Sequence, residues 1–181
     1  MLMNNTVRSR SRTPRAGGRG VQLDITVRSR LRRWPVRSEV IRRASRELAD
    51  LCLPGRCGEV SVCLLSGAEM ARINERFLGH SGATDVITFD YSGAGLGLEA
   101  GGDRAEVLDF AGEIFICPEV AAIQGAEFGV TWQKEVLRYL VHGFLHLAGY
   151  DDLEPKARKL MKRRENLLFQ RLDREQGEAW T

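Results

Sequence analysis

The chain has 181 residues, of which 43% are hydrophobic and 28% are charged, and its formal net charge is +3. This length favours one domain, and this composition is that of a globular protein with a core. No run approaches the roughly 18 apolar residues of a membrane span, and no signal-peptide core follows the basic N-terminus, so we expect neither a membrane protein nor a secreted one. A reducing cytoplasm also suits the four cysteines, none of which forms a CxxC pair.

The N-terminus is unusually basic. Residues 1–20 hold five arginines and no acid, and we predict a disordered basic arm followed by a single domain over 21–181. Such an arm suits binding to a phosphate backbone, but a solvated tail or an organelle transit peptide has the same composition.

Hydrophobic periodicity predicts four strands and five helices in the domain. In chain order these are a strand at 21–28, a helix from about Pro35 to Leu51, a strand at 59–65, a helix from Ala68 to Phe77, strands at 85–91 and 107–117, a helix at 119–127, a helix after Thr131 ending near Ala148, and a charged helix at 153–172. The last two strands are joined by a Gly-rich segment and are expected to pair antiparallel. This order predicts an α+β (mixed α/β) fold with a small four-stranded sheet covered by helices.

The segment HGFLHLAGYDD, residues 142–152, has the spacing of a metal site. His142 and His146 are four residues apart, so on a helix they share one face. Gly149 is suited to end that helix in a left-handed conformation, after which Asp152 can return as a third ligand. Three protein ligands leave the open position typical of a catalytic zinc site. The alternative is a pair of buried histidines satisfied by their neighbours.

Apolar residues cover most of the helix that carries the two histidines. The narrow remaining face holds Glu135, His142 and His146. A helix that is apolar almost all round is buried, so the metal site is expected on a buried central helix. Glu135 is a candidate to hold one of the imidazoles.

Three motifs together, TDVITFDY (84–91), GEIFICPEVA (112–121) and HGFLHLAGYDD (142–152), resemble the YbeY family of bacterial rRNA maturation endoribonucleases. The resemblance covers about residues 21–172. It implies a cytoplasmic, metal-dependent, single-strand-specific endoribonuclease with one Zn²⁺ per chain. It also implies action in 16S rRNA 3′-end maturation and ribosome quality control. The implied partners are rRNA and the small ribosomal subunit, with ribosomal proteins or GTPases as further candidates.

Two positions depart from the family pattern. Asp152 stands where the family has a third histidine, which lowers the charge of the site and widens its tolerance for Mn²⁺ or Mg²⁺. Leu78 stands where the family has an arginine, and His80 or Arg76 is a candidate substitute.

Metal-assisted hydrolysis of RNA is the mechanism that these features favour. Gly143 occupies the position that carries the base in H-E-x-x-H enzymes, so a base must come from elsewhere. Glu113 and Asp85 are the catalytic candidates, or else they hold imidazole N–H groups. Asn74 and Thr84 are candidates for phosphate contact, with a structural role favoured for both.

Two other functions fit part of the sequence. A metallopeptidase is suggested by the metzincin-like ligand spacing, although Gly143 argues against it. A non-catalytic ribosome assembly factor is the second alternative, in which a metal only stabilises the fold.

Overall fold

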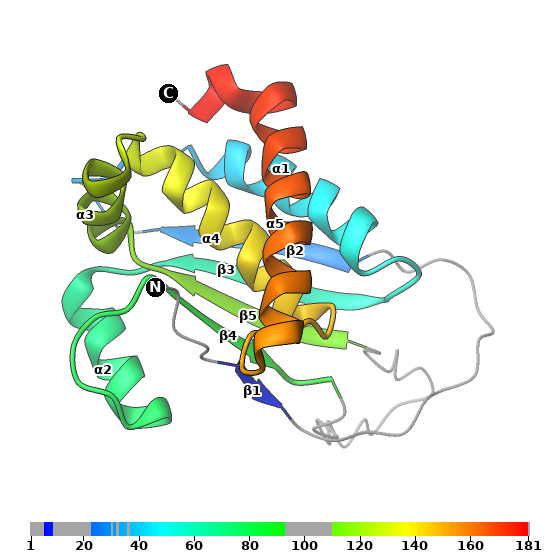
Figure 1. The fold of residues 1–181 in the computed structure, drawn as a ribbon, viewed down its shortest axis with the longest axis horizontal. Helices are drawn as coiled ribbons and strands as arrows, with labels where there is room; N and C mark the ends of the chain where they lie inside the picture. Colours follow the sequence, from blue (N-terminus) through cyan, green and yellow to red (C-terminus); the bar gives the residue numbers. More distant parts are fainter. Residues whose placement is uncertain are drawn as a thin grey trace, which may run out of the picture.

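The computed structural model describes residues 6–8, 23–29, 31, 33–35, 37–92 and 110–180. These residues form one mixed sheet with helices on both faces (Figure 1). The strands are β1 (Thr6–Arg8), β2 (Leu23–Ser29), β3 (Gly58–Leu64), β4 (Val86–Asp90) and β5 (Phe110–Ile116). The helices are α1 (Ser38–Cys52), α2 (Gly67–Leu78), α3 (Pro118–Phe128), α4 (Trp132–Leu147) and α5 (Pro155–Gln176), followed by the 3-10 helix η1 (Gly177–Trp180). The predicted α+β class is confirmed, whereas the Gly-rich connection and most of the basic arm lie outside the described residues.

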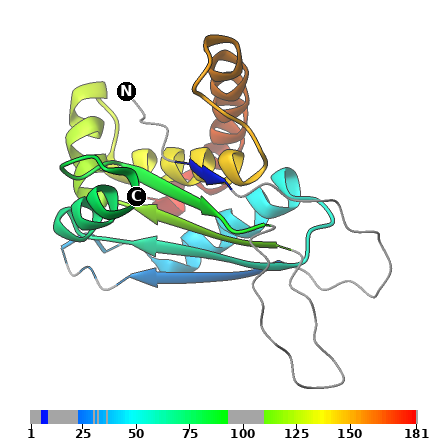
Figure 2. The same ribbon diagram turned by 90° about the horizontal axis from the view of Figure 1, so that it is seen from below.

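The strand order is β1-β4-β5-β3-β2 (Figure 2). Strand β3 pairs parallel with both β2 and β5, whereas β4 and β5 pair antiparallel, as expected. The structure adds β1, which pairs parallel with β4 and places three residues of the N-terminal arm at the edge of the sheet. A three-residue strand is too short to show a period-two pattern in the sequence.

The helix boundaries follow local capping. Helix α1 begins at Ser38, three residues after Pro35, because Arg37 is still extended and acts as its N-cap. Helix α2 begins with a capping box, in which Ser66 accepts a hydrogen bond from the backbone of Glu69 and the Glu69 side chain accepts one from the backbone of Ser66. It ends at Leu78, and the C-cap Gly79, with a φ of 70°, leads the chain into the loop before β4.

The two faces of the sheet carry different helices. Val62 and Ile114 are paired neighbours on the face that packs against α1 and α4, and this face holds the larger core. The opposite face carries α2, whose Met70 packs in a smaller cluster with Ile87 and Phe89. Helix α5 packs on α4 from outside (Figure 1). Helix α4 is therefore enclosed between the sheet, α1 and α5.

Two glycines bring α4 close to the sheet. A Cβ atom on Gly143 would lie 2.7 Å from Cγ2 of Ile114 and 3.2 Å from Oγ1 of Thr88. A Cβ atom on Gly112 of β5 would lie 2.7 Å from Cδ2 of Leu147. One glycine on the helix and one on the strand thus allow closer packing than side chains would permit. The predicted burial of this helix is confirmed.

No helix in the described part of the chain is both long enough and apolar enough to cross a membrane.

We predict that Gly143→Ala destabilises the protein by about 1–2 kcal/mol, because the new methyl group overlaps Ile114 in a packed interior. Helix propensity alone would predict that the substitution stabilises the protein, because it favours alanine over glycine. Thermal unfolding is the measurement, and Gly177→Ala is the matched control. Gly177 has helical φ and ψ of −55° and −39°, and its added Cβ would meet only the Asp173 side chain, at 3.3 Å. Equal melting temperatures for wild type and Gly143→Ala would contradict the packing argument.

Candidate metal centre

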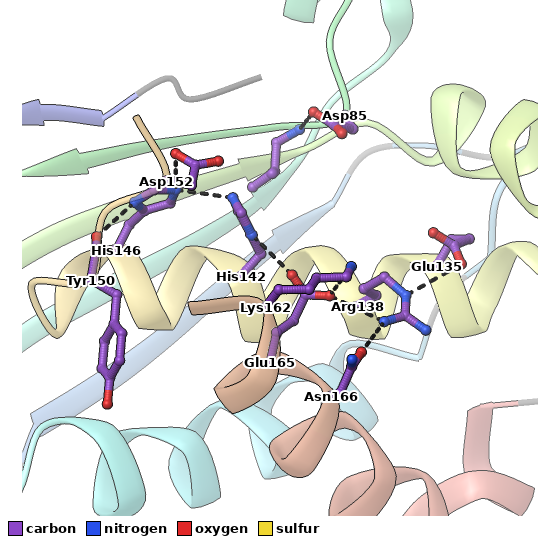
Figure 3. Close-up of polar contacts among 11 residues, drawn as sticks. Asp85, Glu135, Arg138, His142, His146, Tyr150, Asp152, Lys162, Glu165 and Asn166 are labelled. Carbon is purple, nitrogen blue, oxygen red and sulfur yellow. Dashed lines mark hydrogen bonds and ion pairs between the residues drawn. The ribbon is translucent and has the colours of Figure 1, made fainter. Parts of the chain in front are cut away.

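The end of α4 and the turn after it bring three predicted ligands together. His142 and His146 lie one helical turn apart on α4, which ends at Leu147. Gly149 follows with a φ of 92°, the left-handed conformation that its position predicted. The chain then reverses, and Asp152 returns beside the histidines (Figure 3). All three residues are buried, and one ligand-capable atom from each lies within 4.8 Å of the others.

The distances within this group suit a shared cation. The Nε2 atoms of His142 and His146 are 2.9 Å apart, close to the roughly 3.3 Å expected for two nitrogens on one tetrahedral zinc. The Nε2 of His146 is 4.0 Å from Oδ1 of Asp152. That oxygen is buried and has no hydrogen-bond partner among the described residues. A buried, unsatisfied carboxylate oxygen facing two imidazole nitrogens fits a divalent cation.

The other ring nitrogen of each histidine is held by the protein. Nδ1 of His142 is 3.1 Å from Oε2 of Glu165, and Nδ1 of His146 is 3.1 Å from the carbonyl oxygen of Tyr150. Both partners are hydrogen-bond acceptors, so they favour a proton on Nδ1. Each Nε2 atom is then left with a lone pair, and the two Nε2 atoms face each other (Figure 3).

Glu165 was not predicted as part of the site. Its carboxylate is 1% exposed and also accepts hydrogen bonds from Lys162 at 2.7 Å and Arg138 at 3.1 Å. Burial raises the pKa of Glu165, but hydrogen bonds from His142 and Lys162 and the charge of Lys162 outweigh it and lower the pKa to about 2. The carboxylate is therefore ionised across the working pH range.

The sequence did contain a signal for Glu165. The buried residues of α5 follow a helical stripe, and an acid within such a stripe needs a partner. Glu165 is the acid of that stripe, whose members are Met161, Glu165, Leu168, Leu172 and Gln176. The high overall charge of α5 concealed this one buried position.

Glu135 and Asp85 do not contact an imidazole nitrogen in the way proposed for them. Oε1 of Glu135 lies 3.6 Å from Nε of Arg138, and Arg138 is one helical turn before His142. Asp85 is 2% exposed, and its Oδ1 accepts hydrogen bonds from Thr84 and from the backbone of Val86. Its Oδ2 has no partner among the described residues, and burial raises its pKa. Asp85 thus remains a buried carboxyl group with one unengaged oxygen.

The structure places Glu113 away from the metal ligands. Its neighbours Gly112 and Ile114 face α4, so Glu113 points from the opposite face of the sheet. There it accepts a hydrogen bond of 2.9 Å from the hydroxyl of Tyr91. The predicted grouping of Glu113 with the histidines is therefore corrected, because adjacent residues in a strand point to opposite faces.

The remaining sequence candidates divide between structural and cleft positions. Asn74 is buried and donates to the carbonyl of Gly82 at 2.9 Å, which is a structural role. Leu78 packs in the apolar cluster under α2. Arg76 lies over the Phe77 ring, with its Cζ 5.4 Å from the ring centroid.

His142 and Asp152 open into a cleft of about 1290 Å³. The cleft runs beside α4 between α5, the end of α3 and the loop after α2. Its basic side chains are His80, Arg138, Arg158 and Lys162, and its apolar walls include Phe128, Val130, Leu153 and Met161. Nε of Arg158 donates to the carbonyl of Asp152 at 2.8 Å and thereby holds the turn that carries the third ligand.

Comparison with known proteins identifies the family. The family model described as "Endoribonuclease YbeY" matches residues 31–173. The chain belongs to the endoribonuclease YbeY family. The resemblance inferred from the three motifs is therefore confirmed, and with it the assignment to hydrolytic ribonucleases.

Individual YbeY relatives agree with this assignment. The "Endoribonuclease YbeY" of Elusimicrobium minutum is 44% identical over 104 residues, which cover 58% of this chain and 67% of that protein. The one from Salinispora tropica is 34% identical over 132 residues, covering 70% and 82%. The solution structure of a Thermotoga maritima protein matches with a TM-score of 0.57 and 27% identity, covering 87% of this chain and 93% of that one.

Glu113→Gln tests the placement of Glu113. Burial and the neighbouring Glu113 carboxylate raise the pKa of Tyr91 to about 12. Loss of the negative charge should lower this pKa toward 10, while the rate of RNA cleavage stays within about two-fold of wild type. Phenolate absorbance during an alkaline titration measures the shift, and Tyr91→Phe identifies which tyrosine moves. A hundred-fold loss of cleavage would return Glu113 to the active site.

Proposed function

We propose that this YbeY-family protein is a zinc-dependent endoribonuclease that cleaves single-stranded RNA during 16S rRNA 3′-end maturation and ribosome quality control in the cytoplasm. Its proposed partners are rRNA and the small ribosomal subunit, with ribosomal proteins or GTPases as further candidates. The observation that carries the proposal is the convergence of His142, His146 and Asp152 in a large cleft lined by basic groups. The family assignment supplies the reaction class.

Zn²⁺ is the proposed ion, held by Nε2 of His142, Nε2 of His146 and a carboxylate oxygen of Asp152. When bound, a divalent cation supplies Lewis acidity, which makes water nucleophilic near neutral pH and polarises a phosphate oxygen. Two nitrogens and one oxygen suit Zn²⁺, and the carboxylate makes Mn²⁺ or Mg²⁺ more acceptable than at a site of three histidines.

Asp85 is the proposed proton acceptor. Its Oδ2 is unengaged, and its raised pKa favours a group that can take and hold a proton. Position 143 cannot carry this function, because the contact with Ile114 leaves no space for a side chain. This packing also separates the site from H-E-x-x-H peptidases, which need a glutamate at that position.

His80 is the proposed substitute for the arginine that the family pattern has at Leu78. The other basic side chains of the cleft are engaged: Arg138 and Lys162 with Glu165, and Arg158 with backbone carbonyls. His80 lines the cleft and has no polar partner among the described residues, so it is available to a phosphate group.

The cleft walls favour unpaired RNA. Phe128 and Leu153 line the cleft and are 65% and 63% exposed. Unpaired bases can stack on an aromatic ring and lie against apolar surface, whereas the bases of a duplex are already stacked on one another.

Cleavage of labelled RNA tests the proposal. Zinc-loaded wild type should cleave a single-stranded oligoribonucleotide, leave the matching duplex largely intact, and lose activity with EDTA. Asp152→Ala should lose at least about a hundred-fold while remaining folded, whereas Arg163→Ala, on the exposed face of α5, should match wild type. Cleavage of casein but not RNA would favour a peptidase. A folded, metal-loaded protein that cleaves neither would favour an assembly factor.

The same assay tests the two residue assignments. Asp85→Asn keeps the shape of the side chain and should lower kcat by about a hundred-fold with zinc content unchanged. His80→Ala should raise KM for RNA by several-fold and His80→Lys should restore it, because a lysine also donates a hydrogen bond to a phosphate group. Unchanged kinetics in Asp85→Asn would remove the assignment of Asp85, and unchanged kinetics in His80→Ala would remove that of His80. Neither result would affect the metal site.

A further inference from the structure

A buried carboxylate links α5 to the candidate metal centre. Oε2 of Glu165 lies 3.1 Å from Nδ1 of His142, and both residues are at most 3% exposed (Figure 3). A carboxylate this deeply buried is costly unless it is fully paired, so the contact has a defined geometry.

The opposite side of Glu165 is held equally firmly. Oε1 accepts from Lys162 and Arg138, and Arg138 in turn donates to Asn166 at 3.3 Å. Cζ of Arg138 also lies 4.3 Å from the centroid of the Phe169 ring. Glu165 therefore cannot rotate without breaking several contacts, and two cations balance its charge.

The two histidines differ in the hydrogen-bond acceptor that faces Nδ1. Nδ1 of His146 faces a neutral backbone carbonyl, that of Tyr150, whereas Nδ1 of His142 faces the Glu165 carboxylate, which also accepts from Arg138 and Lys162. An anionic acceptor fixes the proton on Nδ1 more strongly and makes the opposite nitrogen a better donor to a cation.

We propose that Glu165 is a positioning residue, which fixes the tautomer and orientation of His142 and strengthens its Nε2 as a metal ligand. The inference rests on the proposed function, because it concerns the same metal site. It adds that metal affinity depends on the docking of α5 on α4. Arg138 and Lys162 act through Glu165 by holding its carboxylate in place.

Zinc affinity of the full chain tests this directly, by competition with a chromophoric chelator. Glu165→Gln keeps an oxygen near Nδ1 but loses the charge, and should weaken zinc binding by about 10-fold; Glu165→Ala should approach 100-fold. Asp173→Asn is the matched control, because it removes a different α4–α5 ion pair, from Lys134 to Asp173 at 3.0 Å. This control should bind zinc as wild type does, and thermal unfolding of the zinc-free proteins checks that each variant is folded.

Nitrogen-15 NMR of the histidine rings gives a second readout that needs no variant. The chain has three histidines, so their ring signals are few. Zinc-loaded wild type should show His142 protonated on Nδ1. A proton on its Nε2, or wild-type zinc affinity in folded Glu165→Gln and Glu165→Ala, would overturn the inference. If wild type binds zinc but does not cleave RNA, the proposed function fails and the positioning role of Glu165 stands.

Discussion

The close contact between α4 and the sheet is the constraint on which the rest of the structure depends. Gly143 and Gly112 bring the helix and β5 nearer than side chains would allow. A helix enclosed this tightly buries its polar groups along with its apolar ones. Its histidines must then be paired by neighbouring groups or by an ion, because leaving them unpaired would cost several kcal/mol. Gly143, which allows this close packing, also occupies the position at which H-E-x-x-H motifs carry the base.

The polar groups around α4 form a connected series of contacts that starts at the three candidate ligands. The Nδ1 atoms of the two histidines face Glu165 and the Tyr150 carbonyl. Arg138 and Lys162, which also line the cleft, contact the other oxygen of Glu165 and balance its charge. The two imidazoles are thus held through Nδ1, so their Nε2 atoms are oriented before any cation binds. Such preorganisation is what a hydrolytic site requires, because reorganisation during the reaction would raise the barrier.

Local patterns in the sequence were sufficient for most of the elements and for the convergence of His142, His146 and Asp152. The two histidines, Gly149 and Asp152 all lie within eleven residues, so the end of one helix and the turn after it bring them together. Contacts between distant segments were harder to predict. Glu165 comes from another helix, and β1 joins the sheet from a segment that composition marks as a tail. The prediction for Glu113 was wrong because packing decides which face of a strand turns toward a given helix. Both faces of β5 are partly apolar in the sequence, so the sequence does not distinguish them.

The central claim is that one divalent cation is bound by His142, His146 and Asp152. Anomalous diffraction at the zinc absorption edge, from crystals of the zinc-loaded protein, tests it most directly. The account predicts one strong peak per chain, roughly 2.0–2.2 Å from both Nε2 atoms and from a carboxylate oxygen of Asp152. A peak bound through Nδ1, or one that Asp152 does not contact, would contradict the site as described.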